Sequence, residues 1–237
     1  MGDRIGMTRL LLISSSTVHG YGYLDQPEPE IRSFLGSAKR VAFVPFAIHD
    51  RDGYAAKVRE RLGRMGLEVS QVRGPKDLEA AEAVFVGGGN TFRLLKALYE
   101  TKVFEAVRDK VRSGMPYMGS SAGSNVAGPT IKTTNDMPIV YPPTFDAFGF
   151  VPFQINPHYL DADPNSTHMG ETREQRIIEF LEENETAVVA IREGSALRVE
   201  GGVTRLVGSR AARVFRRGEA PVEVEPGSER FPVDAFA

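Results

Sequence analysis

Cysteine is absent from this chain of 237 residues, and histidine is scarce. Without a thiol the protein can form no disulfide bond and has neither a thiolate metal ligand nor a cysteine nucleophile, so covalent catalysis has to use an oxygen or a nitrogen atom. No two histidines have the i, i+4 spacing that places paired metal ligands on one helical face. We therefore expect neither a metal site nor any other cofactor. The four histidines are His19, His49, His158 and His168.

An excess of positive charge is also missing, as are long hydrophobic segments. The 29 basic and 31 acidic residues give a formal net charge of -2, which leaves no general basic surface for binding nucleic acid. The most apolar stretch near the N-terminus, residues 10–13, is far shorter than a secretory hydrophobic region or a membrane span. We expect a cytoplasmic protein that binds neither nucleic acid nor a membrane.

The hydrophobic pattern alternates between short apolar runs and amphipathic stretches. Residues 9–13, 40–46 and 83–86 are apolar runs that end near glycine, proline or polar residues, and they predict buried parallel strands. Amphipathic stretches such as residues 54–65 predict helices between them. From residue 195 onward, short alternating segments separated by glycines predict antiparallel hairpins.

These elements predict an α/β fold in three layers, with helices on both faces of a mostly parallel sheet and a small antiparallel region near the C-terminus. The length suits one well-filled core, so we expect a single domain over residues 1–237. Residues 219–237 are rich in glutamate and proline, and we expect them to form a loosely held tail.

A nucleophile-elbow pattern, Gly119-x-Ser121-x-Gly123, follows a short predicted strand. In such an elbow a sharp turn between a strand and a helix presents the serine oxygen above the sheet, and the glycines make room for the strained backbone. Ser120 and Ser124 lie nearby, but only Ser121 has a glycine two residues away on each side. Ser121 is therefore the candidate nucleophile. The alternative is an unreactive turn of glycine and serine.

A serine hydroxyl needs a base within hydrogen-bond reach, and histidine is the usual partner because its pKa lies near neutrality. His158 is the best candidate, since it follows the strand-like run 150–155 and strand ends carry site residues in α/β folds. His19 and His49 also follow strand-like runs, whereas His168 lies in a polar segment and is the weakest candidate. The alternative for His158 is a structural role.

The base has to be oriented by an acid that stabilises its charged form. Glu193 follows a predicted strand at residues 187–191, so we expect it at the same sheet edge as the other candidates. Asp136 lies in the long irregular segment between Ser121 and His158. The residue pattern leaves the choice between these two acids open, and each could instead serve as a turn or cap residue.

An oxyanion formed at the serine also needs backbone amide donors. The amide of Ala122, directly after the nucleophile, is one candidate, and Gly88 or Gly89 in the glycine run supplies the other. Asn90 suits the N-cap of the following helix and is also a candidate substrate contact. The same run is only weakly similar to a dinucleotide-binding loop, because Phe92 stands where that fingerprint has its third glycine.

Four segments follow one another along the chain: Val86-Gly87-Gly88-Gly89-Asn90-Thr91-Phe92, Gly119-Ser120-Ser121-Ala122-Gly123, Thr133-Thr134-Asn135-Asp136-Met137-Pro138 and Asn156-Pro157-His158. Together they resemble peptidase E, the family of α-aspartyl dipeptidases. Residues 170–176 are also similar to this family, and the resemblance runs from about residue 10 to about residue 193. It implies a flavodoxin-like fold related to class I glutamine amidotransferases, with serine in place of their catalytic cysteine. Residues 1–6 precede the usual start of the family and are expected to be an extension, either a vector remnant or a misassigned initiation.

Carried over by position, the resemblance implies that Ser121 is the nucleophile and His158 the base. Both Asp136 and Glu193 lie at positions that match the family, so the third member stays open. One residue departs from the family pattern: Ser120 stands where tryptophan is expected, which leaves the shape of the pocket near the nucleophile undetermined.

The activity that the resemblance implies is hydrolysis of small peptides that begin with aspartate. A carboxylate on the first residue of the substrate calls for a fixed cation, and arginine binds carboxylates in a two-point fork. Arg173 and Arg176 are the candidates, although arginines on a charged amphipathic helix are commonly solvated. Two alternatives are a cyanophycinase-like hydrolase of β-aspartyl links in a storage polymer and a non-catalytic binding module of the same fold. Whether the protein is a monomer or a homodimer stays open.

Overall fold

The computed structural model describes residues 8–165, 167, 169–228 and 231–233. Two of the sequence predictions, the extension at residues 1–6 and His168 as a candidate base, lie outside these residues. The helices and strands, in chain order, are β1 (Arg9–Ile13), α1 (Glu28–Leu35), β2 (Arg40–Val44), α2 (Arg51–Gly63), β3 (Glu68–Gln71), the 3-10 helix η2 (Pro75–Leu78), β4 (Ala83–Val86), α3 (Thr91–Glu100), α4 (Val103–Arg112), β5 (Tyr117–Ser120), α5 (Ala122–Asn125), β6 (Gln154–Tyr159), α6 (Arg173–Glu183), β7 (Val188–Arg192), β8 (Ser195–Glu200), β9 (Val203–Gly208), β10 (Ala212–Phe215) and β11 (Val222–Val224).

The strands of the described residues form two sheets. The first has the order β3-β2-β4-β5-β1-β8-β9, in which β3, β2, β4, β5 and β1 are parallel and the hairpin of β8 and β9 is antiparallel. The second has the order β11-β10-β7-β6, with only β6 and β7 parallel. The predicted α/β fold with a mostly parallel sheet and antiparallel C-terminal hairpins is confirmed.

The position of β7 differs from the prediction. The strand before Glu193 was expected in the same sheet as the strand before Ser121, but β7 pairs with β6 and β10 in the second sheet. All five residues of β7 are buried, and a buried apolar strand has the same hydrophobic pattern in either sheet. His158 and Glu193 therefore come from the second sheet, whereas Ser121 and the glycine run come from the first.

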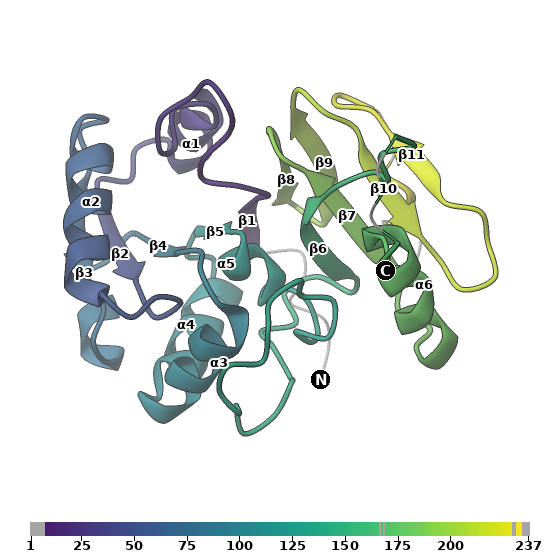
Figure 1. The fold of residues 1–237 in the computed structure, drawn as a ribbon. Helices are drawn as coiled ribbons and strands as arrows, with labels where there is room; N and C mark the ends of the chain where they lie inside the picture. Colours follow the sequence, from purple (N-terminus) through teal and green to yellow (C-terminus); the bar gives the residue numbers. More distant parts are fainter. Residues whose placement is uncertain (1–7, 166, 168, 229–230, 234–237) are drawn as a thin grey trace.

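Helices cover both faces of the first sheet (Figure 1). Along β1, successive side chains point to opposite faces. Leu11 belongs to the cluster that includes residues of α1 and α2, such as Phe34 and Val58, whereas Leu10 belongs to the cluster that includes residues of α3, such as Leu94. The inner strands are buried on both sides, which explains why they appear in the sequence as continuous apolar runs.

The second sheet lies at the opposite end of the molecule from α2 (Figure 1). One of its faces packs against α6, where Ile177 and Leu181 cluster with Val188 and Phe215. On the other face, Val189 belongs to the main core. The second sheet is therefore packed on both sides and can hold the side chains at its edge in fixed positions.

Part of the segment expected to be a loose tail is packed against the second sheet. β11 pairs with β10, and the side chains of Phe231 and Val233 are buried in the main core. These apolar side chains bind the segment to the core in spite of its glutamates and prolines.

Candidate active site

Ser121 lies in a strained turn between β5 and α5. Its backbone has φ +54° and ψ -111°, a conformation that non-glycine residues rarely adopt. A Cβ atom on Gly119 would collide with the backbone of Gly123, and one on Gly123 would collide with the carbonyl of Val86. Both glycines of the pattern are therefore required by close backbone packing. Ser121 is half-buried and can meet a substrate, whereas Ser120 is fully buried.

His158 joins the serine to an acid. Its Nε2 atom lies 2.8 Å from the Oγ atom of Ser121, and its Nδ1 atom lies 2.7 Å from the Oε1 atom of Glu193. In the tautomer with the proton on Nδ1, the ring donates to the carboxylate and accepts from the serine hydroxyl. His19 and His49 are exposed and form no hydrogen bond with Ser121 in the described part of the chain.

Of the two candidate acids, only Glu193 contacts His158. Asp136 comes from the irregular segment after α5 and lies beside the first turn of α3. Its Oδ2 atom accepts hydrogen bonds from the backbone amide and the hydroxyl of Thr91, at 2.7 and 2.6 Å. Asn90 is the N-cap of the same helix, and its side chain accepts from a backbone amide in the first turn at 3.0 Å. Asp136 and Asn90 thus hold the glycine run and α3 in place.

The three candidate oxyanion donors differ in their hydrogen bonds. Gly88 lies against the nucleophile, since a Cβ atom on it would be 3.0 Å from the Cβ atom of Ser121. Its amide donates to the hydroxyl of Tyr54 at 3.0 Å. Within the described residues, the amides of Gly89 and Ala122 donate to no other group. These two amides are therefore available to a developing negative charge, whereas the amide of Gly88 holds Tyr54.

Tyr54 was not identified from the sequence as a site residue. The hydroxyl of Tyr54 accepts two hydrogen bonds, one from the amide of Gly88 at 3.0 Å and one from the hydroxyl of Tyr23 at 3.4 Å. Burial raises the pKa of Tyr54 and that of Tyr23, so both phenols keep their protons. Because Tyr54 accepts two hydrogen bonds, its own proton is left for a third group. The signal in the sequence was a tyrosine on the otherwise apolar face of a helix that follows a strand end.

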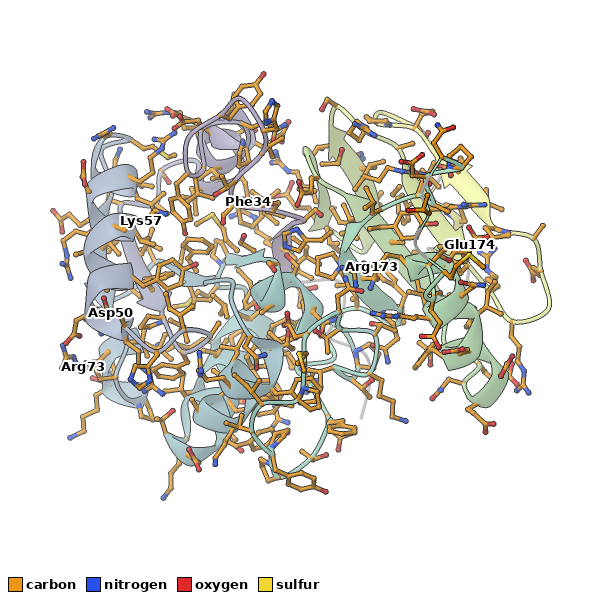
Figure 2. All side chains as sticks on the ribbon, viewed as in Figure 1. Phe34, Asp50, Lys57, Arg73, Arg173 and Glu174 are labelled. Atoms are coloured by element: carbon orange, nitrogen blue, oxygen red, sulfur yellow. The ribbon has the colours of Figure 1, made fainter. Side chains whose placement is uncertain are left out.

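Arg173 and Arg176 lie in different surroundings. Arg173 is half-buried at the start of α6 (Figure 2), and in the described chain no carboxylate forms an ion pair with it. Burial of its guanidinium and the nearby charge of Arg176 lower the pKa of Arg173, and the charge of Asp136 opposes them. Arg176 is exposed and lies 3.5 Å from a carboxylate oxygen of Glu171.

A cavity of about 460 Å³ opens beside Ser121 and His158. Its wall includes the glycine run and side chains of α2 and of the loops before α1 and α2, among them Tyr23, Tyr54 and Lys57. A cavity of similar size, about 490 Å³, lies between α6 and β10 and contains none of the candidate site residues. The first cavity is therefore the candidate substrate site.

In the described ranges of the chain, no group of three His, Asp or Glu side chains is placed to hold a metal ion. Across the same ranges, no helix has both the length and the apolar character that crossing a membrane requires.

An elbow serine on an α/β fold, with a histidine and a carboxylate in line behind it, is the arrangement of a serine hydrolase. The model of Peptidase family S51 matches residues 10–207. The chain therefore belongs to peptidase family S51, and the resemblance to peptidase E is confirmed.

The curated relatives agree with this family. Peptidase E of Streptomyces coelicolor is 57% identical over 224 residues, which are 93% of this chain and 92% of the relative. A Drosophila melanogaster protein named "Probable alpha-aspartyl dipeptidase" is 46% identical over 92% of this chain and 93% of its own. The crystal structure of a peptidase from an acI-B1 Actinobacterium has a TM-score of 0.68 with 16% identity, and covers 94% of this chain and 96% of that one. It shares the fold.

Proposed function

We propose that this protein is a serine dipeptidase that hydrolyses Asp-Xaa peptides by way of an acyl-enzyme. The observation that carries the proposal is the continuous line of hydrogen bonds from Ser121 through His158 to Glu193. The substrate is supported by family membership, by a relative named as an α-aspartyl dipeptidase and by the half-buried cation of Arg173.

In the first step, the Oγ atom of Ser121 attacks the carbonyl carbon of the N-terminal aspartate. The hydroxyl proton passes to Nε2 of His158, which lies 2.8 Å away, and Glu193 stabilises the imidazolium that forms. When the peptide bond breaks, His158 gives the same proton to the leaving amine. The products are the free second residue and an aspartyl ester on Ser121.

In the second step, water hydrolyses the ester. His158 takes a proton from the water molecule, the hydroxide attacks the ester carbonyl, and the proton returns to the Oγ atom of Ser121 as aspartate leaves. Both steps pass through an oxyanion. We assign its stabilisation to the amides of Gly89 and Ala122, with the hydroxyl of Tyr54 as a third donor, while Gly88 positions Tyr54.

The side-chain carboxylate of the substrate is assigned to Arg173. A half-buried guanidinium without a protein carboxylate can form a bidentate pair with a substrate. The charge of Asp136, which lies beside the start of α3, raises the pKa of Arg173. Arg176 is the less suitable candidate because it is exposed and already near Glu171.

The proposal includes small peptides with N-terminal aspartate as the only class of partner, and a cytoplasmic location. The near-neutral charge balance, which leaves no general basic surface for nucleic acid, supports this class of partner. A monomer and a homodimer are both compatible with this site, which is formed within one chain.

The test is a dipeptide panel assayed with wild type, Ser121→Ala and the control Ser120→Ala. We expect wild type to cleave Asp-Leu much faster than Ala-Leu and β-aspartyl-arginine. Ser121→Ala should lose at least 1,000-fold in kcat, at the order of magnitude of triad mutants, and Ser120→Ala should keep its activity. Faster cleavage of β-aspartyl-arginine would support the cyanophycinase-like alternative. Failure of a serine-reactive phosphonate to label Ser121 would support the non-catalytic one.

A further inference from the structure

The wall of the cavity beside the nucleophile includes a lysine. Lys57 lies on α2 and lines the cavity together with Ser121 and His158. It follows Tyr54 by three residues and Gly53 by four, so the three residues share one face of the helix. Figure 2 shows Lys57 on α2 and Arg173 at the start of α6.

The ammonium group of Lys57 is not neutralised by the protein. Among the described residues no carboxylate lies within ion-pair distance of it. Its Nζ atom lies 4.4 Å from the centroid of the Tyr23 ring, a contact that orients the ammonium group and leaves its charge intact. Asp50 also lines the cavity, but its carboxylate accepts a hydrogen bond from the amide of Gly53 at 2.9 Å and so caps α2.

The proposed substrate carries two carboxylates. One is the side chain of the N-terminal aspartate, which is assigned to Arg173. The other is the C-terminal carboxylate of the second residue, a short distance beyond the scissile bond on the leaving side. We propose that Lys57 binds this C-terminal carboxylate, so that the cavity holds the second residue and selects peptides with a free terminus there. The inference rests on the proposed function and adds a binding site to it.

The chemistry of lysine suits this role. The ammonium group is a compact point charge on a flexible stem with three donors, so it can follow the carboxylate as the side chain of the second residue varies. A longer peptide or a C-terminal amide presents a neutral group to Lys57 and loses the ion pair. A cavity of about 460 Å³ gives room for the residue beyond the scissile bond, and Lys57 lies in its wall.

The experiment compares Asp-Leu with Asp-Leu amide, which differ only in the terminal charge. Wild type, Lys57→Gln, Lys57→Arg and the control Lys76→Gln are assayed for kcat and KM. Lys76 is an exposed lysine in η2, outside the site. For wild type we expect kcat/KM at least tenfold higher for Asp-Leu than for its amide, mainly through KM.

Lys57→Gln should lower kcat/KM for Asp-Leu at least tenfold and leave the value for the amide unchanged, so that the preference disappears. Lys57→Arg should keep most of the preference, and Lys76→Gln should match wild type. The unchanged rate on the amide also reports that Lys57→Gln is folded and catalytically competent.

A preference that survives in Lys57→Gln, or an equal loss on both substrates, overturns the role of Lys57 while the proposed dipeptidase stands. Absence of activity of wild type on both substrates, or full activity of Ser121→Ala, overturns the proposed function and this inference with it. The two failures are therefore distinguishable.

Discussion

The buried hydroxyl of Ser14 connects His158 to the strand that leads to Glu193. It accepts a hydrogen bond of 2.9 Å from the backbone amide of His158 and donates one of 2.7 Å to the carbonyl of Ile191. The backbone of His158 has φ +55°, a value that non-glycine residues seldom adopt and that needs support from its surroundings. Ser14 directly follows β1. It thus links the first sheet to the ends of β6 and β7, where His158 and Glu193 lie.

The first prediction concerns Ser14→Ala. The variant leaves the amide of His158 without its partner, so we expect a loss of about 1–3 kcal/mol in the free energy of unfolding and a fall of about tenfold in kcat on Asp-Leu. Urea denaturation and steady-state kinetics measure the two effects. The control is Thr101→Ala, which removes a hydroxyl that donates to the carbonyl of Ala97 at 2.7 Å, remote from the site. If Ser14→Ala changes stability alone, as the control should, Ser14 does not position His158.

The roles of Glu193 and Asp136 should be distinguishable by the rate at which a phosphonate labels Ser121 in variants of each residue. Glu193→Gln removes the charge that stabilises the imidazolium, so we expect kcat to fall by about 100-fold or more, together with the rate at which a phosphonate labels Ser121. Asp136→Asn acts at the start of α3 and near Arg173, so it should raise KM for Asp-Leu and leave phosphonate labelling close to wild type. Slower labelling in Asp136→Asn, with normal labelling in Glu193→Gln, would reverse the assignment.

Arg173→Gln is expected to change specificity. Without the guanidinium, the carboxylate of the substrate enters a half-buried place with no cation, and kcat/KM for Asp-Leu should fall about 100-fold while the slow rate on Ala-Leu stays the same. Arg176→Gln is the matched comparison on the same helix and should change neither rate more than about threefold, since surface pairs contribute little. Equal losses on both dipeptides in Arg173→Gln would assign this arginine to the structure of α6.

The elbow and the histidine could be predicted because their signals are local. Gly119 is required by its contact with Gly123 in the same turn, and Gly123 by the carbonyl of Val86 on the neighbouring strand β4. Both requirements appear in the sequence as the short elbow pattern. His158 follows a strand-like run, and the ends of strands in an α/β fold carry side chains to a common edge. The order of strands and helices was predictable for the same reason, since burial on both faces produces continuous apolar runs.

The choice of acid could not be made from the sequence, because it depends on how β7 pairs. Glu193 reaches His158 only because β7 lies beside β6 in the second sheet. The apolar residues of β7, Val188 to Ile191, do not indicate which strand lies beside them. Ser14 and Tyr54 were missed for a related reason. Each acts through a contact with a residue distant in the chain, His158 or Gly88, and neither has a neighbouring motif that indicates such a contact.

Tyr54→Phe tests the third oxyanion donor. The variant removes the hydroxyl that holds the amide of Gly88 and offers its own proton to the oxyanion, so kcat on Asp-Leu should fall about 10- to 100-fold with KM nearly unchanged. Tyr23→Phe removes only the longer hydrogen bond of 3.4 Å and should have a much smaller effect on kcat. If Tyr54→Phe keeps the wild-type kcat, the hydroxyl of Tyr54 does not stabilise the oxyanion, and the amides of Gly89 and Ala122 are its only donors in this proposal.

Asp161 should make stability depend on pH through its pair with Arg192. The buried guanidinium of Arg192 binds both oxygens of Asp161 at 2.7 Å, and these hydrogen bonds lower the pKa of Asp161. Because the pKa is lower in the folded state than in the unfolded state, the pair stabilises the fold above the unfolded pKa, which is near 3.9 for aspartate, and this contribution is lost as the pH falls through the folded pKa.

Asp161→Asn should therefore lower the free energy of unfolding at pH 7 by about 0.5–1 kcal/mol, a modest value because Asp161 is half-exposed and Arg192 keeps its bonds to Glu223. The difference from wild type should persist down to about pH 5 and shrink as the pH falls below about 4. Urea denaturation at pH 7, 5 and 3.5 measures this difference. Asp109→Asn is the control, because Asp109 is exposed and its ion pair with Arg108 is long, at 4.0 Å. A difference that stays constant over this range would mean that Asp161 contributes through packing or neutral hydrogen bonds, and not through its charge.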